Sequence, residues 1–145
     1  MSDRKGSVHW EGRGKEGKGR IGTESGALKD VNYGFATRFE DDKRGTNPEE
    51  IVGAAHAACF TMAFAFALEA AGLTATRIDT KAAVRLAKDG AGFKIDRIQL
   101  ELDAAVPNLD EAKFQEIAAA AKAGCPLSKA LASVPEMTLK ATLAS

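Results

Sequence analysis

The most hydrophobic stretch of this chain runs from Ile51 to Leu68, and its apolar residues cover nearly every side of a helix. A helix that is apolar all round is either buried in a protein core or spans a membrane. Much of this stretch is alanine, which is only weakly hydrophobic, and His56 and Thr61 interrupt it. No second stretch of this kind follows. We therefore predict a fully buried helix.

Two patterns compete for the start of this helix. Thr46 and Glu49 fit a capping box, in which each side chain bonds the backbone N–H of the other residue. Asn47 followed by Pro48 fits a start one residue later, with proline at the first helical position. The sequence does not separate the two. Gly72 predicts the end of the helix, because glycine readily adopts the left-handed conformation found after helix ends.

Alternation of apolar and polar residues predicts strands elsewhere. Residues 77–106 alternate on both sides of a turn at 88–92, which indicates a long antiparallel hairpin. The step from Ile95 to Ile98 breaks the period of two, so we expect a bulge there. Shorter runs between turn residues predict further strands at Val8–Trp10, Arg20–Thr23, Tyr33–Phe39 and Met137–Leu143.

A second helix is expected after the hairpin. It begins near Asn108 or Asp110, passes through alanine-rich sequence and ends at Gly124. Pro126 can then open a short third helix, with Cys125 at or beside its N-cap. Strands and helices are segregated along the chain, which predicts an α+β fold rather than a parallel sheet. A length of 145 residues is most economically a single domain, residues 1–145.

Composition argues against several classes of function. The 20 basic and 20 acidic side chains cancel, so the charge favours neither nucleic acid nor an anionic membrane surface. The N-terminus is polar and resembles no secretory signal, which makes the cytoplasm the expected compartment, where structural disulfides are rare. The two histidines, His9 and His56, and the two cysteines lack the spacing of a zinc site, so we expect no metal.

Cys59 and Cys125 are the two thiols of the chain, and their predicted settings differ. Cys59 lies in the middle of the apolar helix, where burial would raise its pKa. Cys125 lies at a helix start, where unpaired N–H groups and the helix dipole would favour its thiolate. Buried cysteines are commonly inert. Either Cys59 is a core residue, or a cation from elsewhere in the fold reaches it.

Arginine is the cation best suited to a buried thiolate, because it stays protonated. Arg38 is a candidate, and Arg20 and Arg44 are others. A buried arginine needs a carboxylate partner, which Glu49 could provide. Glu49 lies about 15 Å before Cys59 along a continuous helix. It could therefore orient the arginine but could not touch the thiol.

His56 stands one helical turn before Cys59 on the same face, which allows a Cys–His pair of the kind used in acyl transfer. We favour a histidine hydrogen-bonded within the core, because the sequence shows no third group to orient such a pair. Several apolar side chains near these residues could line a substrate pocket or belong to the core. They are Phe39, Phe60, Met62 and Phe64.

Several short segments follow one another in a specific order. They are Trp10–Gly12, Thr23–Gly26, Tyr33–Phe35, Thr37–Glu40, Gly45–Glu50, Gly53–Phe60 and Lys122–Pro126. In this order they resemble the OsmC/Ohr family of organic hydroperoxide reductases, specifically its OsmC (osmotically inducible protein C) branch. The resemblance covers nearly the whole chain. Its most specific parts are the Asn-Pro-Glu and Ala-Cys-Phe motifs around the long helix and the later Gly-Cys-Pro motif.

The resemblance implies an OsmC-like α+β fold with antiparallel and mixed sheets wrapped around two central helices. It also implies an intertwined homodimer with active sites at the subunit interface, and neither metal nor prosthetic group. The implied activity is that of an antioxidant, stress-related peroxidase acting on organic hydroperoxides. A dithiol reductant, of the dihydrolipoyl type, would regenerate the protein.

The resemblance also implies roles for the candidate site residues. Cys59 would be the peroxidatic thiolate, and Cys125 the resolving thiol that closes an intramolecular disulfide with it. Arg38, held by Glu49, would stabilise the thiolate and the leaving alkoxide. Arg20 is the alternative, since the Ohr branch takes its arginine from the earlier strand region.

Two other functions stay open from the residues alone. One is a non-enzymatic dimeric stress or ligand-binding protein in which both thiols are structural. The other is a Cys–His hydrolase that uses His56 as its base.

Overall fold

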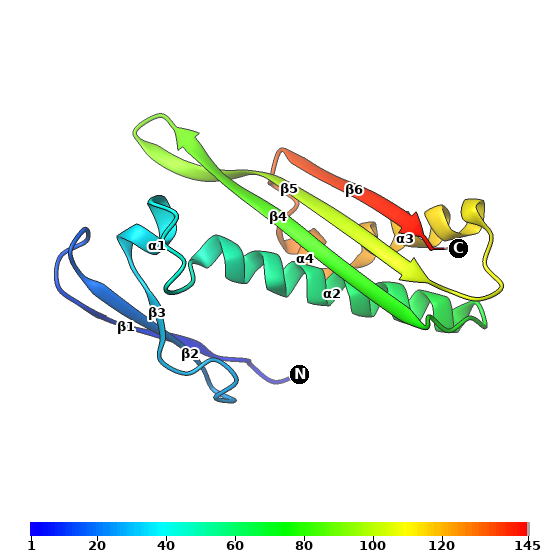
Figure 1. Ribbon diagram of the computed structural model, residues 1–145, viewed down its shortest axis with the longest axis horizontal. Helices are drawn as coiled ribbons and strands as arrows, with labels where there is room; N and C mark the ends of the chain where they lie inside the picture. The colour runs from blue at the N-terminus through cyan, green and yellow to red at the C-terminus, as the bar shows by residue number, and fades with distance from the viewer. Residues whose placement is uncertain (145) are drawn as a thin grey trace. The chain divides into compact units, whose positions relative to one another are not determined.

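The computed structural model describes residues 1–144, which form two compact units. The N-terminal unit is Met1–Ile51, and the C-terminal unit begins at Val52. Figure 1 labels the elements of both units. In chain order they are β1 (Gly6–Glu11), β2 (Lys18–Thr23), β3 (Val31–Tyr33), α1 (Phe35–Phe39), α2 (Pro48–Ala70), β4 (Arg77–Asp89), β5 (Gly92–Ala105), α3 (Glu111–Gly124), α4 (Pro126–Ala130) and β6 (Glu136–Leu143).

The N-terminal unit contains an antiparallel sheet in the order β1-β2-β3. The register places Val8 opposite Ile21. The rings of Trp10 and Tyr33 meet edge to face with centroids 5.5 Å apart. Gly19 lies between these rings, and a Cβ at this position would overlap the Tyr33 ring. A glycine is therefore required for the two aromatic side chains to approach across the middle strand.

The prediction of one strand over Tyr33–Phe39 is wrong. The strand β3 ends at Tyr33, and residues 35–39 form the short helix α1. Gly34 precedes this helix, and its N–H donates to the Thr37 hydroxyl at 2.9 Å. The rings of Phe35 and Phe39 lie 5.0 Å apart. A five-residue run with aromatic residues at its ends fits the i, i+4 spacing of a helix as well as the alternation of a strand. The hydrogen bond between the Gly34 N–H and the Thr37 hydroxyl stabilises the helical alternative.

The sheet of the C-terminal unit has the order β4-β5-β6. Strands β4 and β5 form the predicted antiparallel hairpin, and β6 pairs in parallel with β5 (Figure 1). The register passes from Arg85 opposite Arg97 to Leu86 opposite Ile95. Asp96 is therefore an extra residue, which confirms the bulge expected between Ile95 and Ile98.

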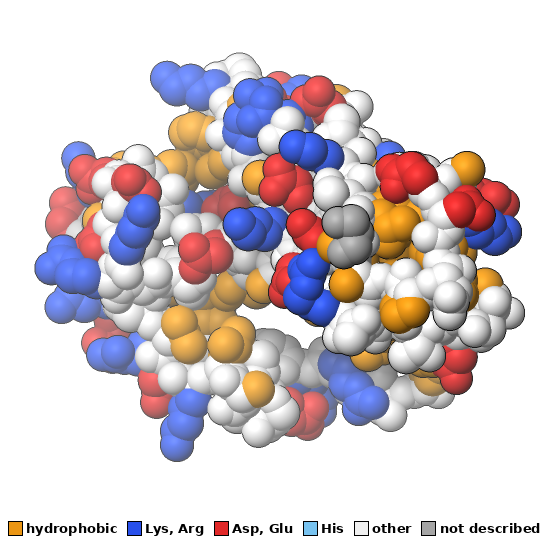
Figure 2. Space-filling model, turned by 45° about the vertical axis from the view of Figure 1, so that its right-hand side comes forward, with side chains coloured by type: hydrophobic (Ala, Val, Ile, Leu, Met, Phe, Trp, Pro, Cys, Tyr) orange, Lys and Arg blue, Asp and Glu red, His pale blue; other side chains and the backbone are white. Residues whose placement is uncertain are grey.

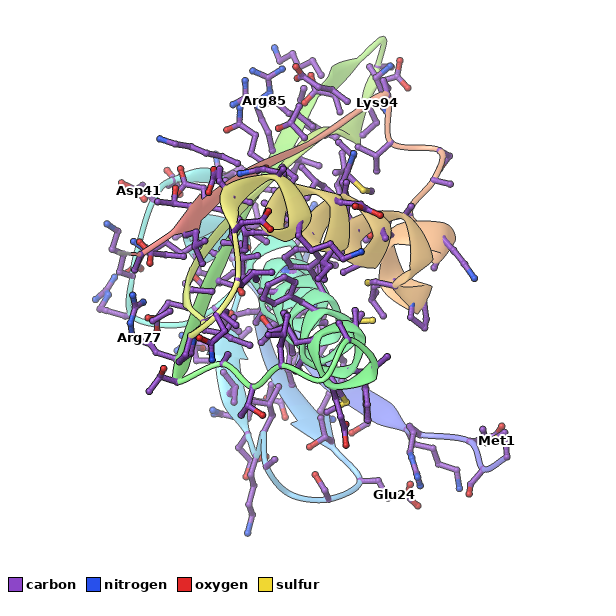
Figure 3. All side chains as sticks on the ribbon, turned by 90° about the vertical axis from the view of Figure 1, so that its right-hand side faces the viewer. Met1, Glu24, Asp41, Arg77, Arg85 and Lys94 are labelled. Carbon is purple, nitrogen blue, oxygen red and sulfur yellow. The ribbon has the colours of Figure 1, made fainter. Side chains whose placement is uncertain are left out.

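The core of this unit lies between the sheet and two helices. Strand β5 alternates, with its buried residues facing the helices and its charged residues facing away. Phe64 of α2 and Phe114 of α3 meet at right angles with ring centroids 5.8 Å apart. Figure 3 shows α2 and α3 on the same side of this sheet. The largest fully buried apolar side chains are Phe60, Phe64, Phe114, Leu68, Ile98, Leu100 and Leu102.

The opposite face of the sheet carries ion pairs. Arg77 near the start of the hairpin bonds Asp103 at 2.9 Å, and Arg85 near its turn bonds Asp96 at 2.8 Å (Figure 3). On the side of the molecule shown in Figure 2, acidic and basic side chains are interspersed, in keeping with their equal numbers. Exposed pairs of this kind contribute little to stability, so the core supplies most of it.

The start of α2 follows the second of the two predicted patterns. Asn47 caps the helix, since its Oδ1 accepts a hydrogen bond from the Glu50 N–H at 2.8 Å. Pro48 is the first helical residue, where its missing N–H costs nothing. The helix ends at Ala70, and Gly72 follows with a positive φ of 76°.

The prediction that α2 is fully buried is wrong. Its buried positions form a single stripe that includes Gly53, His56, Phe60, Phe64 and Leu68. Met62 and Phe66, on another side of the helix, are 63% and 64% exposed. One sheet and one neighbouring helix can cover only part of a helix surface. The helix is long and apolar enough to cross a membrane by length and composition, and 28% of its most apolar window is buried.

Candidate functional site

The two cysteines of the chain lie together in the C-terminal unit. Cys59 comes from the middle of α2, and Cys125 from the junction between α3 and α4. Although 66 residues separate them, their Sγ atoms are 3.1 Å apart and share a hydrogen bond. Both are free thiols. A disulfide bond is about 2.05 Å long, so a shift of about 1 Å would join them.

The position of Cys125 follows from the residues on either side of it. Gly124 is the last residue of α3, and Pro126 is the first of α4. Cys125 between them is extended, with φ of −62° and ψ of 130°, so it ends one helix and precedes the next. Proline cannot continue the hydrogen bonding of the first helix, but its fixed φ suits the first position of the second. This break in the helix places Cys125 beside α2.

The surroundings of the two thiols differ. Burial raises the pKa of Cys59, and Cys125 raises it further, against a smaller lowering by the Leu127 backbone N–H. Burial also opposes ionisation of Cys125, but its hydrogen bonds with the Cys59 sulfur, the Ser128 hydroxyl and backbone N–H, and the Leu127 backbone N–H outweigh burial and lower the pKa of Cys125. None of these described groups around Cys59 carries a positive charge. Within its own unit, Cys59 therefore lacks the stabilisation that a reactive thiolate needs.

His56 lies one turn before Cys59, but its hydrogen bond goes to another residue. Its Nε2 is 2.8 Å from the hydroxyl of Ser128, and its Nδ1 has no partner among the described residues. The ring is completely buried, which lowers the pKa of His56. The favoured interpretation of His56, a histidine bonded within the core, agrees with this geometry. The Cys–His pair of a hydrolase is not formed.

Arg38 and Glu49 form an ion pair in the N-terminal unit. The Arg38 Nη2 donates to Glu49 Oε1 at 2.7 Å, and its Nε lies 3.2 Å and 3.3 Å from the two carboxylate oxygens. Glu49 is buried, whereas the Arg38 side chain is 36% exposed. Two parallel contacts hold the guanidinium in a defined orientation, with donors left for another group.

The other two candidate arginines have different settings. Arg44 is bound to Asp42 at 2.8 Å, and this contact lowers the pKa of Asp42 to about 2. Arg20 is exposed on β2, opposite His9 in the register. Of the three, Arg38 is the one in contact with Glu49.

The proposed pocket residues fall into two groups. Phe60 and Phe64 are completely buried in the core, so they are packing residues. Phe39 and Met62 are 41% and 63% exposed and could contact another molecule. Within residues 1–144 no group of three or more histidine, cysteine or carboxylate side chains is placed to hold a metal.

Two residues at the site were not expected from the sequence. Ser128 bonds both His56 and Cys125, and the Leu127 backbone N–H bonds both sulfurs. The signal was available in Cys125-Pro-Leu-Ser128, because a residue at i+3 in the first turn of a helix lies near the N-cap residue. The contact with His56 could not be found in this way, since it joins residues 72 positions apart.

Comparison with known sequences identifies relatives along the whole chain. A family model described as OsmC-like protein matches residues 40–140. The chain is 54% identical over 142 residues to peroxiredoxin OsmC of Escherichia coli (strain K12), covering 98% of this chain and 97% of that protein. It is 30% identical over 113 residues to the organic hydroperoxide resistance protein OhrB of Bacillus subtilis (strain 168), which covers 77% of this chain and 80% of that protein.

Solved structures share the fold. The crystal structure of Bacillus subtilis OhrB superposes with a TM-score of 0.68 at 29% identity, covering 97% of this chain and 98% of that one. An OsmC-like protein from Mycoplasma pneumoniae superposes with a TM-score of 0.78 at 16% identity, covering 99% of both chains. The predicted α+β fold, with mixed and antiparallel sheets, is therefore confirmed.

Proposed function

The chain belongs to the OsmC-like protein family, and from that premise we propose that it is a thiol-dependent peroxidase that reduces organic hydroperoxides to alcohols. The names of its relatives, a peroxiredoxin and an organic hydroperoxide resistance protein, support a peroxidase role in hydroperoxide resistance. The observation that carries the detailed proposal is the 3.1 Å separation of the Cys59 and Cys125 sulfurs.

The proposed reaction has three steps. The Cys59 thiolate attacks the terminal oxygen of the hydroperoxide, the O–O bond breaks, and the alkoxide leaves and takes up a proton. Cys59 is then a sulfenic acid. The Cys125 sulfur attacks the Cys59 sulfur, the S–O bond breaks, and a disulfide and water form. A dithiol, which we propose to be of the dihydrolipoyl type, reduces the disulfide by thiol exchange.

In this proposal Arg38 provides the positive charge that Cys59 lacks. Burial raises the pKa of Cys59, so the thiolate requires a cation at reaction distance. Arg38 is held by the buried Glu49 and stays protonated through the reaction. The same charge would stabilise the developing alkoxide. Arg20 and Arg44 lack the contact with Glu49.

We propose further that the protein acts as a homodimer in the cytoplasm. The exposed side of α2 presents Ala54, Ala58, Met62, Ala65 and Phe66. A large apolar surface on a long helix is costly to leave in water, and a second copy would bury it. Replacing Phe66 by glutamate should lower the molecular mass measured by analytical ultracentrifugation towards that of one chain. An unchanged mass for Phe66→Glu would argue against this side of α2 as the interface.

The function is tested by one equivalent of cumene hydroperoxide added to the reduced protein. Intact mass and free-thiol titration should show the loss of two hydrogens and of both thiols without a link between chains. Cys59→Ser should abolish peroxide reduction, and Cys125→Ser should stop after one turnover at the sulfenic acid. If both thiols stay titratable after peroxide treatment, the thiols are structural and the peroxidase proposal fails.

A further inference from the structure

The proposed reaction leaves the most buried polar group of the C-terminal unit without a role. The His56 side chain is completely buried, and its Nδ1 has no partner among the described residues. In a neutral imidazole one nitrogen donates and the other accepts, so either tautomer leaves Nδ1 unsatisfied. Buried polar groups are nearly always paired, and an exception in a native protein calls for an explanation.

A chain of hydrogen bonds connects His56 to one of the reacting sulfurs. His56 Nε2 lies 2.8 Å from the Ser128 hydroxyl. The same hydroxyl bonds the sulfur of Cys125. His56 comes from α2, whereas Ser128 and Cys125 come from α4 and the residue before it. All three are buried, so bulk water does not compete for these bonds.

We propose that Ser128 and His56 form a proton relay that activates Cys125 for disulfide formation. This inference rests on the proposed peroxidase function, and it assigns roles to two residues in the second step. Ser128 touches the reacting sulfur and is a catalytic residue in this step. His56 acts through Ser128 and is a positioning residue that also holds the proton.

The protons and electrons of this step balance. The Ser128 hydroxyl, which donates to Cys125 in the resting protein, first rotates to donate to His56 Nε2, so that its oxygen can accept from the Cys125 S–H. The Cys125 proton then passes to the Ser128 oxygen while the Ser128 hydroxyl proton passes to His56 Nε2. The Cys125 electron pair then forms a bond with the Cys59 sulfur, and the S–O bond of the sulfenic acid breaks. The oxygen leaves as hydroxide. The hydroxide and the proton leave together as one water molecule, and His56 returns to its neutral form.

The geometry assigns the relay to Cys125 rather than to Cys59. A histidine three residues before Cys59 on α2 lies on the same side of the helix, yet its bonded nitrogen faces Ser128. The Ser128 hydroxyl and backbone N–H both act on Cys125 and are absent from the groups that act on Cys59. Burial keeps His56 neutral near pH 7, which is the form that accepts a proton.

The relay is tested by following the two oxidation steps separately. Reduced protein is mixed with one equivalent of cumene hydroperoxide, quenched at intervals and analysed by intact mass for sulfenic acid and disulfide. In Ser128→Ala we expect sulfenic acid to form as in the wild type, and disulfide formation to slow by roughly a hundredfold. His56→Gln should slow the same step, because a carboxamide can bond Ser128 but cannot take its proton.

Further variants separate proton transfer from packing. Ser128→Thr keeps the hydroxyl and should restore most of the rate. Ser133→Ala makes the same serine replacement at an exposed position nearby and should match the wild type in both steps. Disulfide formation should be slower in D₂O for the wild type and lose this isotope effect in His56→Gln. A structural role for His56 would leave the isotope effect in place.

The outcomes distinguish this inference from the proposed function. If the wild type forms neither sulfenic acid nor disulfide, the peroxidase proposal fails. If it forms sulfenic acid, and both Ser128→Ala and His56→Gln close the disulfide at the wild-type rate, the relay is overturned and the peroxidase stands. Thermal unfolding of each variant checks that the variant is folded under the assay conditions. If Ser128→Ala does not fold, the rate of disulfide formation in His56→Gln decides whether the relay exists.

Discussion

The two units of this protein hold their functional side chains in opposite ways. In the N-terminal unit, Arg38 and Glu49 form a charged pair in which the arginine is partly exposed. In the C-terminal unit, Cys59, Cys125, Ser128 and His56 form a hydrogen-bonded group that contains no arginine, lysine or carboxylate.

The proposed mechanism draws on both arrangements. The apolar core that brings the thiols together also raises the pKa of Cys59. A charge placed within that core would carry a large desolvation cost. A charge held by its own carboxylate near solvent avoids this cost and still provides a permanent cation. Separating the charge from the nucleophile therefore lets each be stable in the folded protein.

The largest expected effect comes from removing the charge of the N-terminal unit. Arg38→Met should reduce the rate of peroxide consumption by roughly 10²–10³-fold, the loss typical of removing one electrostatic contact to a developing anion. Stopped-flow measurement of sulfenic acid formation at neutral pH checks this. Arg44→Met and Arg20→Met are the matched controls and should stay near the wild-type rate.

Glu49→Gln sharpens the same comparison, since it keeps the side-chain shape but weakens the hold on Arg38. It should cause a smaller loss than Arg38→Met. A wild-type rate in Arg38→Met, together with a large loss in Arg20→Met, would transfer the role to the strand arginine.

A smaller effect is expected from breaking the neutral group of the C-terminal unit. Ser128→Ala removes the hydrogen-bond partner of the buried His56 ring, which should lower the free energy of unfolding by about 1–3 kcal/mol. Urea denaturation of the reduced protein measures this. Ser133→Ala, at an exposed position, should change the stability by less than about 0.5 kcal/mol. Equal stabilities for the two variants would show that the bond to His56 contributes nothing measurable.

The smallest expected effect is on the pH dependence of stability. Burial lowers the pKa of His56 from its ordinary value of 6.5, so the folded state binds this proton less readily than the unfolded chain does. Its contribution is present above pH 6.5 and is lost as the pH falls through the lowered pKa of the folded state.

Denaturant unfolding between about pH 7 and about pH 5 checks this prediction. His56→Gln should show a weaker fall in stability over that range than the wild type. His9→Gln, which alters an exposed histidine, should follow the wild-type curve. A wild-type curve for His56→Gln would mean that His56 titrates alike in the folded and unfolded states.

Two elements differ from the sequence-based prediction, one for a local reason and one for a global reason. The short helix α1 was missed because five residues contain too few turns to separate a helical from a strand period. The exposed side of α2 was missed for a different reason. A run that is apolar on every side indicates hydrophobic surroundings but not which elements cover it, and within this unit one sheet and α3 cover one side.

The sequence by itself determined the features that depend on neighbouring residues. The hairpin with its bulge and the proline start of α4 follow from residues within a few positions of one another. Such features are local because backbone conformation and hydrophobic period are local properties.

Only the tertiary structure decided how closely distant side chains approach one another and which further groups join them. It brought the two thiols to 3.1 Å, joined Arg38 to Glu49 and placed Ser128 between His56 and Cys125. These contacts join positions up to 72 residues apart. Their geometry depends on how α2 and α3 pack on the sheet, which no short pattern along the chain contains.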